Sequence, residues 1–148
     1  MTATMNPPLP SHAATERPRM KRMDSPTVTG FADPGPAATH RRLADLPDRV
    51  IEGDPRHETR IVHQSPVGRF LAGTWRSTPG RWRAFTGRDE VCVLTAGHVR
   101  LIAADGTARK FRAGDAFVIP DGFEGEWEVI EAATKHFVIR DTAPGEAP

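Results

Sequence analysis

The chain has 148 residues, of which 20 are Lys or Arg and 19 are Asp or Glu, so its formal net charge is +1. This balance excludes the strong field with which some proteins gather nucleic acid or anionic membranes. Cys92 is the single cysteine, so an intramolecular disulfide is impossible. No apolar run approaches the roughly 18 residues of a membrane span. We therefore expect a soluble, cytoplasmic protein with one folded domain.

The first 40 residues differ from the rest of the chain in composition. They are rich in Pro, Ala, Ser and Thr and carry almost no apolar periodicity. Such a segment cannot bury enough surface to offset the entropy of ordering it. We expect residues 1–40 to be a disordered tail, followed by a lead-in segment over 41–57. A short helix is predicted over His40–Val50, ahead of the turn at Gly53-Asp54-Pro55.

From residue 58 onward the turn signals are dense and the segments between them are short, which is typical of an all-β domain. Asp105-Gly106 is a strong hairpin signal, because a type I′ turn needs positive φ at both central residues. The domain is expected to cover 58–142, which leaves 143–148 as a C-terminal tail. The predicted strands are Glu58–Gln64, Arg69–Arg76, Arg81–Phe85, Glu90–Thr95, Val99–Ala103, Ala108–Phe111, Ala116–Ile119, Glu126–Glu131 and His136–Arg140.

The segment Phe123–Val129 indicates which of its faces lies inside. Apolar residues or glycine alternate there with three glutamates. Because the side chains of a strand point alternately to its two faces, the apolar set should face the interior and the glutamates should face water. Eight or nine short antiparallel strands must close on themselves or stack to hide their edges. The sequence therefore predicts a jelly roll or a small β-barrel.

Two glycine-containing motifs carry a family resemblance. Six residues separate Glu90 from Gly97. Five residues separate Gly114 from Pro120, and one residue separates Pro120 from Gly122. Each glycine closes a tight turn, and Pro120 directs the chain back across the barrel mouth. With sixteen residues between Gly97 and Gly114, the pattern resembles the two conserved motifs of the cupin superfamily. It looks most like the branch of small cupins that includes the ethanolamine-utilisation Q protein and (S)-ureidoglycine aminohydrolase.

The resemblance covers residues 50–140 and implies a cupin jelly-roll barrel. It also implies where a metal would bind. Metal-binding cupins place two histidines before the glutamate of the first motif and one after the second motif, a ligand set suited to Mn, Fe, Ni or Zn. By spacing, the first two positions fall on Ala84 and Thr86, or on Arg83 and Phe85 if the loop is one residue longer, and the third falls on Gly125. None of these residues is a good metal ligand. Only Glu90 remains, and one carboxylate cannot hold a transition metal, so we predict no metal and no cofactor.

The first motif also places a candidate pocket. Glu90, Cys92 and Leu94 share a face by strand alternation, and the family pattern points Glu90 into the barrel. Apolar walls with a few convergent polar groups are typical of a small-molecule site. The candidate residues are Glu90 as a catalytic acid or base, and Trp75, Arg83, Phe85, Cys92, Trp127 and Lys135 as the ligand-binding set.

Each candidate also has a purely structural interpretation. Glu90 can be a buried carboxylate paired with Arg83 or Lys135, because an unpaired one would be costly. Cys92 is expected to be a small buried hydrophobic residue, since no partner is evident to lower its pKa. The tryptophans serve equally well as core or as platforms for a ligand. Lys135, if it does not line the pocket, is expected in solvent.

Three functions remain open. The first is a metal-free cupin that binds a small polar metabolite, with or without acid–base chemistry at Glu90, and the charge placement favours a ligand with a cationic or donor group. The second is a metal-dependent enzyme of small nitrogen or sugar metabolism, with a metal held weakly at Glu90, as the resemblance to the aminohydrolase implies. The third is a non-catalytic regulatory or interaction module. We also expect a homodimer in which Glu58–Gln64 is exchanged, with no nucleic-acid or membrane partner.

Overall fold

The computed structural model describes residues 26–141, so the predicted tails lie outside it over 1–25 and 142–148. In the described part the protein is nearly all β, with nine strands and a single short 3-10 turn, which confirms the predicted fold class. The strands are β1 (Thr39–Arg42), β2 (Val50–Gly53), β3 (Arg56–Gln64), β4 (Phe70–Ser77), β5 (Gly80–Phe85), β6 (Arg88–Ala103), β7 (Ala108–Arg112), β8 (Ala116–Ile119) and β9 (Glu124–Asp141). No helix in this part of the chain has the length and apolar character needed to span a membrane.

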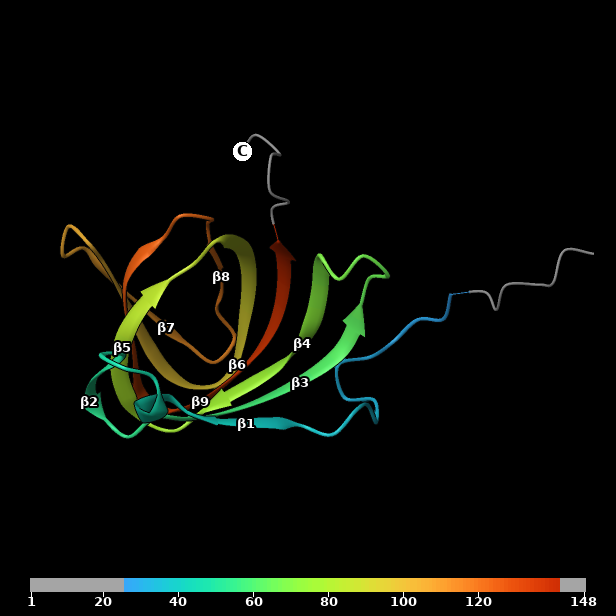
Figure 1. The fold of residues 1–148 in the computed structure, drawn as a ribbon, viewed down its shortest axis with the longest axis horizontal. Helices are drawn as coiled ribbons and strands as arrows, with labels where there is room; N and C mark the ends of the chain where they lie inside the picture. Colours follow the sequence, from blue (N-terminus) through green and yellow to red (C-terminus); the bar gives the residue numbers. More distant parts are fainter. Residues whose placement is uncertain (1–25, 142–148) are drawn as a thin grey trace, which may run out of the picture.

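The two longest strands, β6 and β9, form the centre of the sheet. They pair antiparallel along nearly their whole length, from Arg88↔Asp141 to Ala103↔Gly125. The other edge of β9 pairs with β4 near its C-terminus and with β5 near its N-terminus. The other edge of β6 pairs with β8 along its first half and with β7 along its second half. Figure 1 shows how this one sheet curls into an open, jelly-roll barrel.

A tight bend at Gly97 divides β6 into the two segments that were predicted as separate strands. The pairing of β6 with β9 shifts register on both sides of this glycine. Gly97 has φ +88, and a Cβ atom there would lie 2.7 Å from Ala133 Cα, closer than real atoms approach. The prediction of two separate strands was wrong both here and in 126–140. In both places the chain continues through the sheet as one strand.

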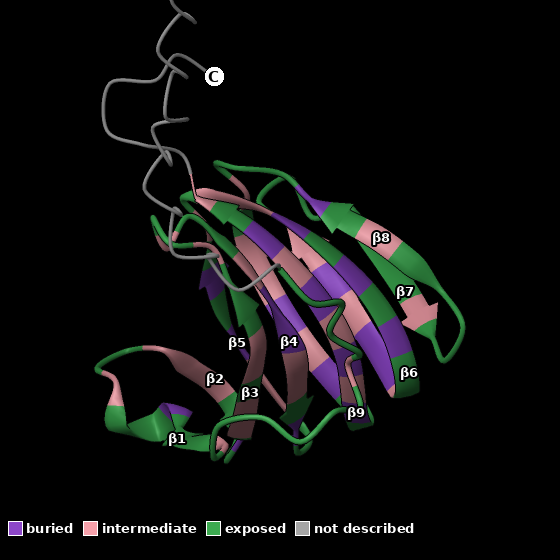
Figure 2. Cartoon of the chain, turned by 90° about the vertical axis from the view of Figure 1, so that its right-hand side faces the viewer, coloured by how far each residue is buried: buried purple, intermediate pink, exposed green. Residues whose placement is uncertain are grey.

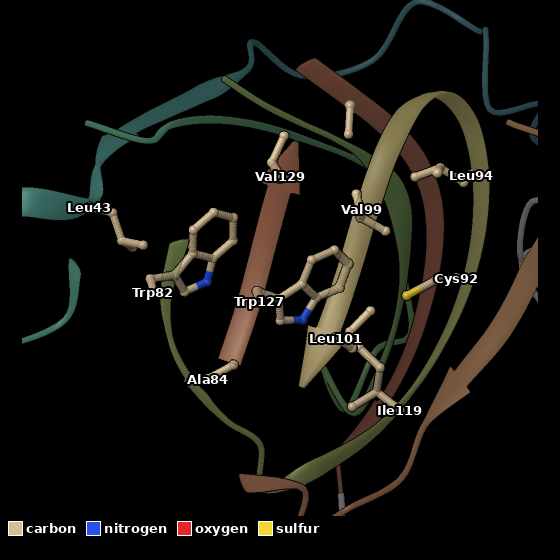
Figure 3. Close-up of a cluster of buried hydrophobic side chains, with 11 residues drawn as sticks. Leu43, Trp82, Ala84, Cys92, Leu94, Val99, Leu101, Ile119, Trp127 and Val129 are labelled. Atoms are coloured by element: carbon tan, nitrogen blue, oxygen red, sulfur yellow. The ribbon is translucent and has the colours of Figure 1, made fainter. Parts of the chain in front are cut away.

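The interior is built from alternating residues of these strands. Cys92, Leu94 and Val99 of β6 are fully buried, and Trp127 and Val129 of β9 are nearly so. Figure 2 shows the alternation as bands of buried and exposed residues along the strands, and Figure 3 shows these side chains gathered inside the curve of the sheet. The expected alternation over 123–129 is therefore confirmed, because the intervening glutamates are exposed or only partly buried.

The segment before the barrel does not form the predicted helix over 40–50. It forms β1, a 3-10 turn at Leu43–Asp45, and then β2. Pro47 opposes a continuous helix, because proline lacks the amide hydrogen that helical bonding requires. Pairing offers an alternative, since β1 joins β3 and β2 joins β5. Leu43 is 2% exposed and packs into the core, so this segment closes one end of the barrel.

Candidate functional site

A cavity of about 200 Å³ opens at the inner face of the barrel, where β3, β4, β5, β6 and β9 converge. We refer to it as the barrel pocket. Five of the seven predicted site residues line it, namely Trp75, Phe85, Glu90, Trp127 and Lys135. Residues that the sequence analysis did not select also line it, among them Arg49, His57, Thr59, Trp82, Thr86 and Arg88.

A buried ion pair lies at the centre of the pocket wall. Lys135 Nζ donates a hydrogen bond to Glu90 Oε1 at 2.6 Å, and the two side chains are 7% and 10% exposed. Lys135 therefore lines the pocket, and the alternative interpretation that placed it in solvent was wrong. Because β9 runs unbroken through this region, Lys135 shares the inward parity of Ala133, Phe137 and Ile139, all of which are buried. Of the two partners proposed for Glu90, the structure selects Lys135.

Aromatic rings enclose this ion pair. Lys135 Nζ lies 4.8 Å from the ring centre of Trp75 and 4.7 Å from that of Trp127, within the range of cation–π attraction. Trp82 stacks parallel to Trp127 with 6.2 Å between ring centres, as Figure 3 illustrates. These three residues are all the tryptophans in the chain. They form an apolar enclosure in which the pair is shielded from water.

The alternation along β5 differs from the one that the predicted site required. Trp82 and Ala84 are buried, whereas Arg83 and Phe85 are exposed. Arg83 lies outside the barrel pocket, where its Nη1 donates to the carbonyl oxygen of Asp48. Phe85 is 60% exposed and reaches the pocket only at its rim. Trp82 faces inward because it pairs directly across the sheet with Trp127.

Cys92 lies beneath the ion pair and has no exposed surface. Its Sγ is 3.6 Å from Lys135 Nζ. Burial raises the pKa of the thiol to about 12, and the nearby Glu90 carboxylate raises it further, against the opposing effect of Lys135. At neutral pH the sulfur is therefore a thiol and a poor nucleophile. Cys92 was predicted to bind the ligand, but it does not line the pocket and packs in the core next to the ion pair.

Two further polar residues come from the lead-in segment and β3. The centre of the His57 ring lies 4.9 Å from the ring centres of both Trp75 and Trp82. Burial, with added repulsion from Lys135, lowers the pKa of His57 to about 4, so the ring is neutral at physiological pH. Its Nε2 and the Nε of Arg49 are buried without a hydrogen-bond partner among the described residues. No motif or periodicity in the sequence marked either residue.

The pocket does not fit the metal site of metal-binding cupins. Ala84 and Thr86 line it at two of the ligand positions and offer no imidazole. At the third position, Gly125, a Cβ would lie 2.9 Å from Phe123 Cζ and closer still to the Ile102 carbonyl, so no side chain fits there. Within residues 26–141 no group of three or more His, Cys, Asp or Glu side chains is arranged to hold a metal ion.

A larger cavity of about 320 Å³ lies beside β7 and β8. Apolar side chains such as Leu101, Phe117 and Ile119 line it, and Arg109 is its one charged residue. None of the predicted site residues borders it. The convergence of polar groups that a specific site needs is found in the barrel pocket instead.

Comparison with solved structures shows the same fold in several proteins. A protein of unknown function from Pseudomonas syringae pv. tomato matches with a TM-score of 0.62 and 20% identity, over 70% of this chain and 44% of its own. EutQ from Clostridium difficile matches with a TM-score of 0.54 and 20% identity, over 60% of this chain and 64% of its own. The putative ethanolamine utilization protein Q of Salmonella typhimurium matches with a TM-score of 0.53 and 17% identity, over 59% of this chain and 71% of its own.

This chain therefore spans less than half of the Pseudomonas protein and under two thirds of the Clostridium EutQ. At these identities the likeness concerns the fold alone. No curated protein matches the chain. A family model, that of the EutQ-like cupin domain, matches residues 64–137, which is half of the chain. Both glycine motifs fall within that match, and the chain belongs to the EutQ-like cupin domain family.

Proposed function

We propose that the protein binds a small polar metabolite in the barrel pocket and does so without a metal. One observation carries this proposal: the Glu90–Lys135 pair is buried among three tryptophans at the wall of a cavity. Taking two charges out of water has a large desolvation penalty, and well-packed apolar residues are often as stable or more stable at such a position. A barrel that served only as a scaffold would have little reason to keep the pair beside an open space.

The cavity size and composition support a ligand of metabolite size. Pockets for drug-sized molecules begin at about 300 Å³, and the barrel pocket has about 200 Å³. The tryptophan rings offer flat apolar surfaces, while Thr59, Thr86 and the ion pair offer hydrogen bonds. Acid–base chemistry at Glu90 is the finer part of this proposal, and it requires the ligand to present an exchangeable proton to that carboxylate.

The two other functions receive less support. A metal-dependent enzyme would need ligands that Ala84, Thr86 and Gly125 cannot provide, and the remaining carboxylate of Glu90 is held by an ammonium group. A non-catalytic interaction module would be expected to fill its barrel with apolar side chains. The retained polar groups Glu90, Lys135 and His57 argue against that alternative.

Thermal-shift screening of a metabolite library tests the proposal, because a ligand that binds only the native state raises the melting midpoint. We expect one chemical class to raise the midpoint of the unmodified protein. Each positive should then be measured on Glu90→Gln. Unchanged binding in this variant would remove Glu90 from the site. Elemental analysis after dialysis completes the test, since near-stoichiometric Mn, Fe, Ni or Zn would contradict the metal-free interpretation.

A further inference from the structure

The charges that line the barrel pocket do not cancel. Glu90 is its one acidic side chain, and Lys135 already neutralises that carboxylate at 2.6 Å. Two guanidinium groups, of Arg49 and Arg88, remain on the wall. His57 adds no charge near neutral pH, because burial lowers its pKa to about 4. The pocket thus presents a surplus of positive charge inside a protein whose overall charge is nearly balanced.

Arg49 is held in place by the backbone on both sides. Its N–H donates to the carbonyl oxygen of Leu46, and its own carbonyl accepts from the N–H of Arg83. The guanidinium lies 4.3 Å from the ring centre of Phe85 at the pocket rim. Its Nε is buried and has no hydrogen-bond partner among the described residues. A buried donor without a partner is costly, and because Arg49 also lines the pocket, a ligand that accepts hydrogen bonds from its guanidinium would offset part of that cost.

Arg88 supplies the second cation from the start of β6. It lies two residues before Glu90, so it shares the parity of the inward-facing residues of that strand. Its side chain is partly buried and makes no ion pair with any residue over 26–141. Two arginines from separate segments therefore border one cavity, and neither has a carboxylate partner in the described chain.

We propose that the ligand of this pocket is a small organic anion, a carboxylate joined to a flat apolar body. This inference rests on the proposed function and adds the chemical class. The planar guanidinium fork matches a carboxylate with two parallel hydrogen bonds. The apolar body lies against the tryptophan rings, which favour stacking. The charge expected from the sequence was the opposite one, a cation for Glu90, but Lys135 already occupies that role.

The three tryptophans allow a direct test of the electrostatic potential in the pocket, because every tryptophan of the chain borders this cavity. Iodide, caesium and acrylamide quench tryptophan fluorescence as an anion, a cation and a neutral molecule. We expect iodide to quench more strongly than caesium, relative to acrylamide, and Arg49→Gln with Arg88→Gln to abolish this preference. Arg60→Gln, an exposed position on β3 outside the pocket, is the matched control. Equal quenching by the two ions would overturn the inference.

A matched ligand series tests binding itself. Benzoate, benzamide and benzylamine share one ring and differ in charge, and binding is followed by tryptophan fluorescence. We expect benzoate to bind roughly tenfold tighter than benzamide, and either arginine variant to lose about that factor, as for a hydrogen bond to a charged group. Melting curves confirm that each variant folds.

The inference is overturned if benzoate binds no tighter than benzamide. It is also overturned if benzoate binds both arginine variants as tightly as it binds the unmodified protein. If benzylamine binds best, the pocket still takes small molecules but of the opposite class. If neither this series nor the metabolite library binds, the proposed function fails as well.

Discussion

The buried ion pair predicts a measurable difference between two Glu→Gln substitutions. In Glu90→Gln, Lys135 keeps its shape-matched neighbour but loses the opposite charge at 2.6 Å. Removing one partner of a buried pair costs about 3–5 kcal/mol. The stranded ammonium still faces two tryptophan rings, and a desolvated cation–π contact is worth up to about 2 kcal/mol. We therefore expect the lower end of that range, about 3 kcal/mol of unfolding free energy.

The chain offers a partly exposed ion pair as the matched control. Arg100 Nε lies 2.6 Å from Glu128 Oε2, and these side chains are 33% and 23% exposed. Because this pair is partly exposed and so better solvated than the Glu90 pair, Glu128→Gln should lower stability by only about 1 kcal/mol. Urea unfolding gives both free energies. Thermal unfolding should show a drop of roughly 10 °C for Glu90→Gln and only a few degrees for Glu128→Gln.

The double substitution Glu90→Gln with Lys135→Met completes the cycle. Met has nearly the length of Lys and carries no charge, so most of the lost stability should return when both charges are gone. Losses of equal size for Glu90→Gln and Glu128→Gln would refute the idea that the Glu90 pair is desolvated. A double variant that is no more stable than the single ones would show that packing, and not the unpaired charge, determines the loss.

Three further predictions follow from the described residues. Gly97 and Gly106 have nearly equal φ angles of +88 and +87, but of the two only Gly97 would bring a Cβ against backbone atoms. Gly106→Ala should therefore lower the free energy of unfolding in urea by about 1–2 kcal/mol, and Gly97→Ala by clearly more. Equal losses would contradict the steric overlap expected at residue 97. Burial lowers the pKa of His57 from 6.5 to about 4, so the unfolded chain binds a proton at this histidine more readily, and stability should decline as the pH falls through that range. The melting midpoint of His57→Gln should decline less over the same pH range. An equal decline in the variant and the unmodified protein would show that other groups cause the pH dependence. Light scattering should give about twice the chain mass of 16.2 kDa, and a single-chain mass for the unmodified protein would refute the predicted dimer. Val118→Glu, at a valine that is 62% exposed on the outer face of β8, should give the single-chain mass if the outer face of β8 is the dimer contact.

The exchange of Glu58–Gln64 between two copies remains a prediction. In the single chain this segment falls within β3, which lies between β1 and β4. Valines at 91, 93 and 118 form an exposed apolar row on the outer face of β6 and β8. This row is where we expect a second copy to pack.

Much of the barrel could be predicted from the sequence because turns and alternation are local signals. Gly97 and Gly114 marked real turns with positive φ, and the glutamates after Phe123 marked the outer face. The parity of β5 could not be determined in this way. Trp82 and Phe85 are both large and aromatic, and they lie on opposite faces. Only the cross-strand pairing with Trp127 decides which of them enters the core.

The site was harder to predict than the fold for a related reason. The inward position of Lys135 depends on β9 continuing through Ala132-Ala133-Thr134, where the sequence carries no strong strand signal. Arg49 and His57 lie in or next to a segment without periodicity, and tertiary packing alone brings them to the pocket. The motif predicted Glu90 because its position depends on a turn seven residues away, which is a short-range constraint.

The central position of β9 has a consequence for how the chain is made. It is the last strand of the described part, yet β4, β5 and β6 all pair with it. As a ribosome releases the chain from its N-terminus, those three strands emerge before the partner that joins them. Their apolar faces and unpaired edges must wait, and such edges are prone to aggregation. Because the joining contacts span long stretches of sequence, closure should also be slow. We therefore expect the nascent chain to be most prone to aggregation before β9 has left the ribosome.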